Sequence, residues 1–397
     1  MRPSPVRSRK AARLRTEDWS IVEHRGLAGL DRIEGDWRRL YLASPLRGGD
    51  QALSVYRAYL EHLCPAPDEF RFLALTRDGA TRAICPLEAR TDRSTGMPVA
   101  AWGSPKHREW LLADVVGPED DARGALLPAV VEHLRRAEDR RPALVLGPLP
   151  ESSVLWEGLA GLDAAGYCAH GEGACDVLDC TLTLDELRAR LSKNFKGNLR
   201  KARNKLAALD GVRFVNATEP QDIAREFDAF LAVEASGWKG AAGTGSAISL
   251  TPAHEAFYRT LSTSLGADGA CEINSLYAED RCIASQFCLR VGEGYEILKI
   301  GYDEGSGRLA PGQLLIEWIL ARCCEDPTVK RLSLVSDEKW HADWQAEPMP
   351  MRQVHAAIGR GADRVLVPLW RLRFGPVRRT VRSLRDRGVL AGSGRPR

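Results

Sequence analysis

The stretch YEILKIGYDEGSGRLAPGQLLIEWILARCCEDPTVKRLSLV, residues 295–335, decides the fold class. Apolar runs at residues 295–302 and 331–335 predict two strands. Between them, apolar residues at helical spacing follow Pro311 and predict a helix, namely Leu314, Leu315, Trp318 and Ile319. Proline suits the first turn of such a helix, where its missing N–H costs nothing. A strand, helix, strand crossover is right-handed and leaves its strands parallel, so the stretch indicates an α/β unit.

The residues before this crossover predict the rest of the unit. Apolar runs at residues 272–277 and 282–291 precede the strand at 295–302, and turn-like residues separate all three runs, which predicts an antiparallel meander. Further upstream we expect a strand at 212–216 and helices near 223–234 and 254–265.

A basic amphipathic helix is predicted ahead of these elements, starting after Thr183 as N-cap and ending before Gly211. Its apolar stripe consists of Leu184, Leu187, Leu191, Phe195, Leu199, Ala202 and Leu206. Residues 188–205 contain no acid and carry eight cations, namely Arg188, Arg190, Lys193, Lys196, Arg200, Lys201, Arg203 and Lys205. Such a face is either solvated or binds an acidic glycan, a lipid phosphate or a tRNA.

The first half of the chain shows the same order of elements. We expect helices at 32–42 and 52–63, a hairpin of 70–76 with 81–89, a strand at 111–116, a helix at 122–137 and a strand at 143–146. With 397 residues the chain is long enough for two domains, so two copies of one α/β unit are the simplest account.

Several motifs in a fixed order carry a resemblance to a known family. They are LSKNFKGNLRKARNKL at 191–206, EASGWKG at 234–240, GT at 243–244, FY at 257–258, KIGYD at 299–303, APGQLL at 310–315 and DEKW at 337–340. This pattern resembles the CelD/BcsL group of GNAT-type acyltransferases, which carry a BioF2-like acetyltransferase domain and are related to FemAB proteins. The resemblance implies an α/β (α+β) tandem GNAT-like repeat with two mixed sheets, each flanked by helices. The expected division is 1–16 (basic arm), 17–175 (N-terminal domain), 176–370 (catalytic domain) and 371–397 (arginine-rich tail).

The resemblance also implies an activity. It is transfer of an acyl group from acyl-CoA, in particular acetyl-CoA, to an amine or hydroxyl of a sugar or lipid-linked acceptor, in exopolysaccharide or cellulose biosynthesis. Two alternatives stay open: a FemAB-like transferase that takes its donor from aminoacyl-tRNA, and a non-catalytic scaffold of a polysaccharide synthase.

The loop that opens the crossover helix is the expected acyl-CoA site. Backbone N–H groups and the positive end of a helix dipole attract phosphate at such a position, and the candidate residues are Arg308, Gly312, Gln313 and Leu314. The usual GNAT phosphate loop has a glycine where this chain has Pro311, which is a departure from the family pattern.

Acyl transfer from a thioester needs a base, an acid for the departing thiolate and a positioned acceptor, but no covalent nucleophile. Glu234 at a helix end, or Asp337 after the last strand, is the candidate base, and Tyr302 the candidate acid. The candidate acceptor-binding residues are Trp238, Lys239 and Lys299.

Charge and composition bear on partners and location. The net charge of +3 conceals +6 in residues 1–15 and +8 in residues 371–397, which leaves −11 for the remainder. Helical spacing of Val377, Val381 and Leu384 among arginines predicts contact with an anionic membrane. Ten cysteines without a CxxC pair, and scattered histidines, predict no metal site. The chain shows no signal peptide or spanning segment, so we expect a cytoplasmic protein, peripheral at the inner face of the membrane, that binds no DNA.

Overall fold

The computed structural model describes residues 19–375 except 45–46, 108, 110–113, 118–121, 138 and 140. The arms at 1–16 and beyond 375, including the expected membrane-binding residues Val377, Val381 and Leu384, lie outside the described residues. The described part is an α/β protein with a mixed sheet, as the sequence predicts. Among the described residues, none of the helices is both long enough and apolar enough to span a bilayer.

The first half contains the predicted helices and hairpin. Its elements are β1 (Ser20–Arg25), α1 (Gly26–Ala43), α2 (Leu53–His62), β2 (Arg71–Arg77), β3 (Ala80–Asp92), β4 (Val99–Gly103), α3 (Leu126–Arg136) and β5 (Ala143–Pro150). The strand parallel to β5 is β4. Of the strand expected at 111–116, residues 111–113 lie outside the described residues, and Val116 forms a single bridge to Ile84. The sequence VAAWG of β4 contains one β-branched residue, so its strand propensity is weak and pairing with β3 and β5 decides its structure.

The second half follows the predicted order and adds two long strands and a final helix. Its elements are β6 (Tyr167–Asp179), α4 (Leu184–Arg190), α5 (Lys193–Leu206), β7 (Arg213–Ala217), α6 (Pro220–Ser236), α7 (Pro252–Ala267), β8 (Cys271–Ala278), β9 (Arg281–Val291), β10 (Gly294–Tyr302), α8 (Pro311–Glu325), β11 (Arg331–Ser333), β12 (Glu347–Ala357) and α9 (Ala362–Phe374). Strands β8, β9 and β10 form the predicted antiparallel meander.

The basic helix expected as one continuous element is two helices. Leu191 is extended, and the Ser192 side chain accepts a hydrogen bond from the Phe195 N–H at 3.1 Å, which starts α5 as a new helix. Apolar spacing continues through the break, because Leu191 and Phe195 pack into the same core on both sides of it. Periodicity alone therefore does not reveal the interruption.

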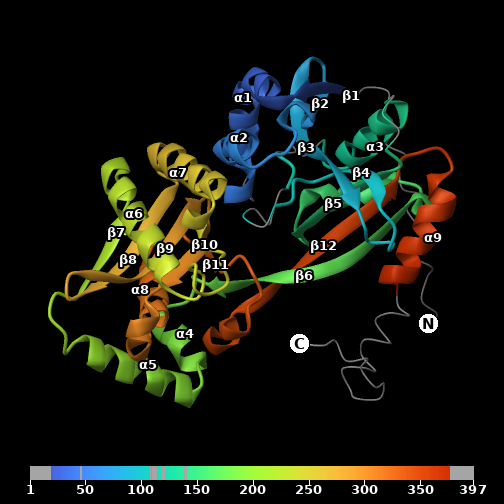
Figure 1. The fold of residues 1–397 in the computed structure, drawn as a ribbon. Helices are drawn as coiled ribbons and strands as arrows, with labels where there is room; N and C mark the ends of the chain where they lie inside the picture. The colour runs from blue at the N-terminus through green and yellow to red at the C-terminus, as the bar shows by residue number, and fades with distance from the viewer. Residues whose placement is uncertain are drawn as a thin grey trace, which may run out of the picture.

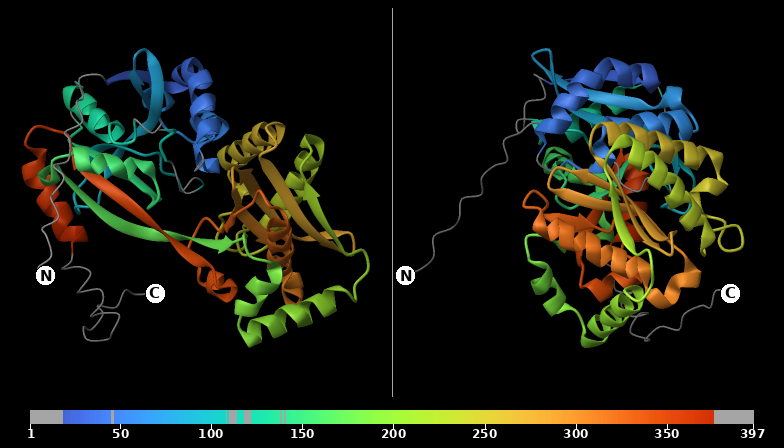
Figure 2. Two further views of the ribbon diagram at one scale, coloured as in Figure 1. Left: turned by 180° about the vertical axis from the view of Figure 1, so that it is seen from behind. Right: turned by 90° about the vertical axis from the view of Figure 1, so that its left-hand side faces the viewer.

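The strands of both halves join in one sheet where we expected two. The order is β1-β2-β3-β4-β5-β12-β6-β11-β10-β9-β8-β7. The long strands β6 and β12 pair with each other and link the halves, as Figure 1 and the left view of Figure 2 show. Helix α9, the last element of the second half, packs its apolar residues Leu366, Val367 and Trp370 against strands β4 and β5 of the first half.

Helices cover the sheet in distinct apolar clusters. One cluster combines α1 and α2 with α6 and α7, so the two halves share a core. A second places α4, α5 and α8 against the meander and β11. Because α7 and α8 belong to different clusters, they cover opposite faces of β9 and β10. Side chains on the two sides of β10 therefore reach two different environments.

Candidate active site

Strand β10 loses one of its two neighbours halfway along its length. It pairs in parallel with β11 over three positions, from Gly294 opposite Arg331 to Glu296 opposite Ser333. Beyond Ser333 the chain stays with β6, since the Leu334 N–H donates to the Asp176 carbonyl at 2.9 Å. We call residues 297–302 the open edge of β10, and among the described strands they pair with β9 alone. The two strands thus part beyond Glu296 and Ser333.

A cavity of about 320 Å³ lies between the open edge and the start of α8, and we call it the α8 cavity. Its lining includes Tyr302, Gly312 and Gln313, three of the residues selected from the sequence, together with Trp340. Leu314 is instead buried in the apolar core. Arg308 is outside the lining, and its carbonyl accepts a hydrogen bond from Lys205 of α5 at 3.3 Å.

The residues at the start of α8 fit a phosphate-bearing ligand in spite of the proline. Pro311 occupies the first helical turn, and Ala310 before it is left-handed with φ 46°. In this turn the N–H groups of Gly312 and Gln313 have no intrahelical acceptor. A Cβ at Gly312 would meet only the Tyr302 ring, at 3.7 Å, so this glycine leaves the cavity open. Pro311 therefore does not close the anion-binding end of the helix.

A second cavity, of about 170 Å³, lies on the α7 face of β10 between the two halves, and we call it the inter-half cavity. Its walls are largely apolar, with Phe257, Leu289 and Met349 among them. Carboxyl groups from three distant segments line it, namely Asp50, Asp114 and Glu296. Glu296 accepts a hydrogen bond from the Gly49 N–H at 3.2 Å. Both halves of the chain are needed to build this cavity.

These carboxyl groups hold protons more tightly than ordinary acids. Burial, followed by the charge of Asp50, raises the pKa of Glu296 to about 7, and Gly49 and Arg331 oppose the shift. Burial and Asp50 likewise raise the pKa of Asp114 to about 7. Burial also raises the pKa of Asp50. Acids poised near neutral pH are suited to proton transfer.

Sequence reasoning missed this group because its members are far apart in the chain. The one local signal is a glutamate within the apolar strand YEIL, since a strand with both faces buried rarely carries an acid without a function. Nothing near Asp50 or Asp114 indicates a shared cavity.

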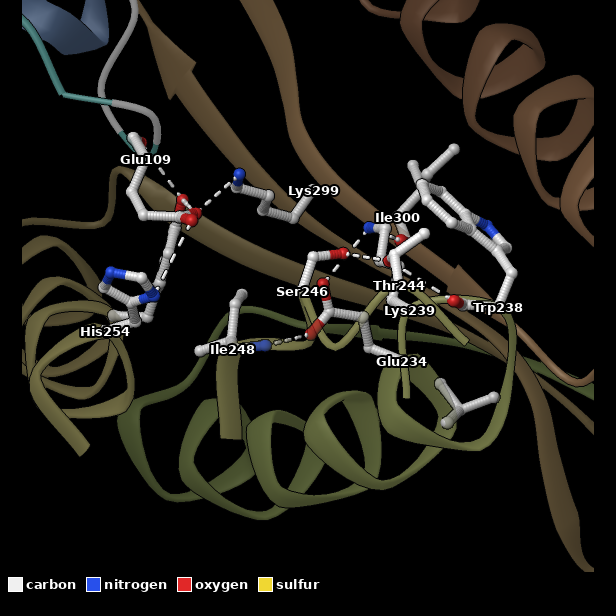
Figure 3. A network of polar contacts seen from close by, with 12 residues as sticks. Glu109, Glu234, Trp238, Lys239, Thr244, Ser246, Ile248, His254, Lys299 and Ile300 are labelled. Carbon is white, nitrogen blue, oxygen red and sulfur yellow. Dashed lines mark hydrogen bonds and ion pairs between the residues drawn. The ribbon is translucent and has the colours of Figure 1, made fainter. Parts of the chain in front are cut away.

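Glu234, a candidate base, is 3% exposed and has both oxygens engaged. Lys239 donates to one oxygen at 3.1 Å, and the Ile248 N–H donates to the other at 2.9 Å. Lys239 also donates to the Ile300 carbonyl at 2.8 Å (Figure 3). Burial lowers the pKa of Lys239, against the attraction of Glu234. Together these contacts tie the glycine-rich loop after α6 to the open edge of β10.

Lys299 joins the second half to the first. Its ammonium lies 2.7 Å from the Glu109 carboxylate, which is 4% exposed, and 5.7 Å from the centre of the Tyr258 ring. His254 of α7 lies 3.8 Å from the same carboxylate (Figure 3). Lys299 and Glu109 both line the inter-half cavity. Lys299 was predicted from the sequence as an acceptor-binding residue, whereas no sequence pattern pointed to Glu109.

The two remaining candidates are on the surface. Trp238 is 51% exposed, and its backbone N–H donates to the Glu304 carboxylate at 3.1 Å. Asp337 is exposed in the segment after β11 and lines neither cavity.

The chain is similar to known proteins in sequence over part of its length and in fold over most of it. Residues 193–345 match the family model described as an acetyltransferase (GNAT) domain. The chain is similar to the solved C-terminal domain of a protein described as a lysylphosphatidylglycerol synthetase from Agrobacterium fabrum, at 13% identity over 88% of this chain and 98% of that chain, with a TM-score of 0.52. It is also similar to FemX, at 10% identity over 82% of this chain and 94% of that chain, with a TM-score of 0.52. No curated protein matches the sequence. The structural similarities concern the fold, and the family match covers residues 193–345 of the second half.

Proposed function

We propose that this GNAT-type acyltransferase moves an acyl group from acyl-CoA to a primary amine carried on a largely apolar molecule. The observation that carries the proposal is the position of the two cavities. They lie on opposite faces of β10, at the point where this strand separates from β11. A donor held on one face can therefore reach an acceptor held on the other through the separation of the strands.

The α8 cavity is the donor side of the proposal. Gly312 and Gln313 would hold phosphate through the first turn of α8, and the acyl-CoA thioester would supply an activated acyl group. Tyr302 lines the same cavity at the end of the open edge. It is accordingly the proposed donor of a proton to the departing sulfur.

The inter-half cavity is the acceptor side, and Glu296 is the proposed base. It lies at the last position where β10 pairs with β11. With its pKa of about 7, Glu296 can accept a proton from the amine near neutral pH. The amine nitrogen then bonds to the acyl carbon, the carbon–sulfur bond breaks, and the sulfur takes a proton from Tyr302. The second proton that the nitrogen releases as it becomes an amide returns to the Tyr302 oxygen through solvent.

The other candidates receive supporting roles. Glu234 and Lys239 are proposed as positioning residues, because they connect the glycine-rich loop to the open edge. Lys299 is proposed to orient the acceptor together with Glu109. Asp337 is the runner-up base, which a comparison of Asp337→Asn with Glu296→Gln would test. Trp238 is exposed and does not line the inter-half cavity, so we propose that it contacts only a part of the acceptor that extends beyond this cavity.

The lining of the inter-half cavity favours an acceptor with an apolar body. Phe257, Leu261 and Leu289 offer apolar surface, while Asp50 and Glu296 attract a cationic head group. A lipid-linked amine fits this combination better than a bare sugar.

Calorimetry with acetyl-CoA and with longer acyl-CoA tests the donor, and release of free thiol with a panel of alkylamines tests the reaction. We expect saturable binding and amine-dependent thiol release. Absence of acyl-CoA binding would refute the proposal and favour the non-catalytic scaffold.

The cationic side chains of α5 suggest a second kind of acyl donor. Its side chains Lys193, Arg200 and Lys201 have no ion-pair partner within the described part of the chain, and they line a surface groove. The same helix contacts the loop before α8 through Lys205. This favours an aminoacyl group delivered on RNA as the alternative. Transfer from radiolabelled aminoacyl-tRNA without thiol release would select it.

A further inference from the structure

Helix α9 exposes large apolar side chains to solvent. Seven such side chains are exposed among the described residues, and only α9 carries two of them, Val365 at 58% and Leu372 at 68%. Single apolar residues are normal on a protein surface, whereas a group of them marks a binding surface. No residue of α9 lines the α8 cavity or the inter-half cavity, so the acyl-transfer proposal gives this surface no role.

The exposed apolar residues of α9 lie on one face of the helix. Val365 and Leu372 are seven positions apart, which is about two helical turns, and exposed Pro368 and half-buried Leu369 lie between them. We call these four residues the α9 ridge. The residues that pack against the sheet lie on the opposite side of the helix. Figure 1 shows α9 at the outer edge of the molecule, on the side away from α4, α5 and α8.

Arginines flank the α9 ridge on both sides. At about 100° per residue, Arg364 and Arg371 lie on one side of the ridge and Arg373 lies on the other. Arg364 and Arg373 are exposed and form no ion pair within the described part of the chain. Arg371 is exposed and donates to two backbone carbonyls, which leaves its charge uncompensated. The acid of this helix, Asp363, is half-buried in the first turn, on the side opposite the ridge.

Acids near α9 offset only part of this charge. Asp92 and Glu172 lie with Arg373 around one pocket, so they lower the net charge on that side of the ridge. On the other side, Arg364 and Arg371 form no ion pair with a described residue. The sequence that follows α9, residues 376–397, adds seven arginines and a single acid, Asp386. The ridge therefore belongs to a cationic end of the chain.

Three occupants can cover the α9 ridge: residues 376–397, a second copy of the chain, or a lipid bilayer. The first brings seven more arginines next to those of α9, and the second brings two arginine-flanked ridges together. Like charges repel in both arrangements. An anionic bilayer instead offers apolar chains to the ridge and phosphate groups to the arginines beside it. Charge complementarity thus favours the bilayer.

We propose that the α9 ridge binds the surface of an anionic membrane. Val365 and Leu372 enter the boundary between head groups and acyl chains, and Arg364 and Arg373 extend to lipid phosphates on either side. The helix needs no rearrangement, because its other face stays packed on the sheet. This inference goes beyond the acyl-transfer proposal and does not depend on it.

Flotation of the full chain with lipid vesicles tests the proposal. One set of vesicles is phosphatidylcholine alone, and the other is phosphatidylcholine mixed with phosphatidylglycerol. We expect flotation with the mixed vesicles only, because the arginines require anionic head groups. Absence of flotation with the mixed vesicles, or equal flotation with both sets, would overturn the proposal.

A double variant locates the contact. Val365→Ser combined with Leu372→Ser should lower the partition coefficient for the mixed vesicles at least about 10-fold. Leu42→Ser removes an apolar side chain that is 66% exposed on α1, and as the matched control it should leave flotation unchanged. Thermal unfolding of the double variant should match that of the wild type, because the changed side chains are exposed. Flotation of the double variant equal to that of the wild type would overturn the proposal.

Two further measurements separate the other occupants. Replacing Val377, Val381 and Leu384 with serine tests the terminal segment, and loss of flotation in this triple variant but not in the double variant would assign membrane binding to that segment. Gel filtration tests the second copy: a wild-type dimer that the double variant converts to a monomer, without flotation of either, would make the ridge a contact between copies. Both outcomes overturn the proposal. Acetyl-CoA binding should survive in the double variant, so the result is independent of the acyl-transfer proposal.

Discussion

The two halves of the chain contain the same strand, helix, strand crossover but treat its parallel pair differently. In the first half β4 ends at Gly103, the last residue paired with β5, and the next N–H donates to the Val145 carbonyl at 3.1 Å. In the second half β10 continues to Tyr302 after its pairing with β11 ends at Glu296. The two halves therefore differ in which strand continues: in the second half it is the first strand of the crossover, β10, and in the first half it is the second strand, β5, which runs on to Pro150.

The first half, which has no such opening between β4 and β5, nevertheless contributes residues to the cavity beside β10. Gly49, Asp50 and Asp114 of the first half complete the inter-half cavity beside Glu296. Glu109, also of the first half, is paired with Lys299. The comparison therefore separates the two proposed sites: the second half alone lines the proposed donor site, and both halves line the proposed acceptor site.

The largest effect is expected from filling the α8 cavity beside the open edge of β10. Gly312→Leu would place a branched side chain in the α8 cavity, where a Cβ has room beside Tyr302. We expect acetyl-CoA binding to fall below detection in calorimetry while circular dichroism stays unchanged. Gly197→Leu, at another helical glycine with open space around its Cβ, is the control. Tight acetyl-CoA binding by Gly312→Leu would show that the opening is not the donor site.

Removing the proposed base is expected to have the next largest effect. Glu296→Gln should lower kcat for amine acylation roughly 10²-fold and leave acyl-CoA affinity unchanged. Because the base must be ionised, the wild-type rate should rise with pH through about 7, the pKa of Glu296. Glu293→Gln, at an exposed site before β10, is the control. A pH profile that stays the same in Glu296→Gln would assign the base elsewhere.

A smaller effect concerns the contribution of the first half to stability. The pKa of Asp114 rises from 3.8 to about 7 on folding, so its protonated form is favoured in the native state. Stability from this group is present at low pH and is lost as pH rises from about 4 to 7. Asp114→Asn should stabilise the protein by ~1–3 kcal/mol at pH 8 and change little at pH 4. Thermal unfolding at both pH values measures this, and an equal change at both would contradict the shift.

The smallest effect on function is expected from a change in the parallel pair of strands of the first half, β4 and β5. A Cβ at Gly103 would lie 2.7 Å from the Val145 carbonyl oxygen and 2.5 Å from Arg90. Gly103→Ala should therefore destabilise the fold by ~1–3 kcal/mol in denaturant unfolding. Acetyl-CoA affinity should change less than twofold. A large loss of affinity would mean that the first half also holds the donor.

Patterns of neighbouring residues predict structure correctly where the contacting residues are close together in the chain. The meander, its crossover helix and the residues Tyr302, Gly312 and Gln313 lie in one continuous segment, and the structure brings these three residues into one cavity. Leu314, next in the same motif, points into the core instead, because its helical position faces the sheet. A motif therefore locates a loop more reliably than it selects the side chains that line a cavity.

The sequence by itself determined the antiparallel meander, the parallel crossover and the loop at the start of α8, because apolar periodicity and turn residues act over a few neighbouring positions. Only the tertiary structure decided that two sheets would become one, that β10 would outlast β11, and that Asp50, Asp114 and Glu296 would share a cavity. These features depend on pairing and packing between distant segments, and their raised pKa values exist only once burial has removed the surrounding water.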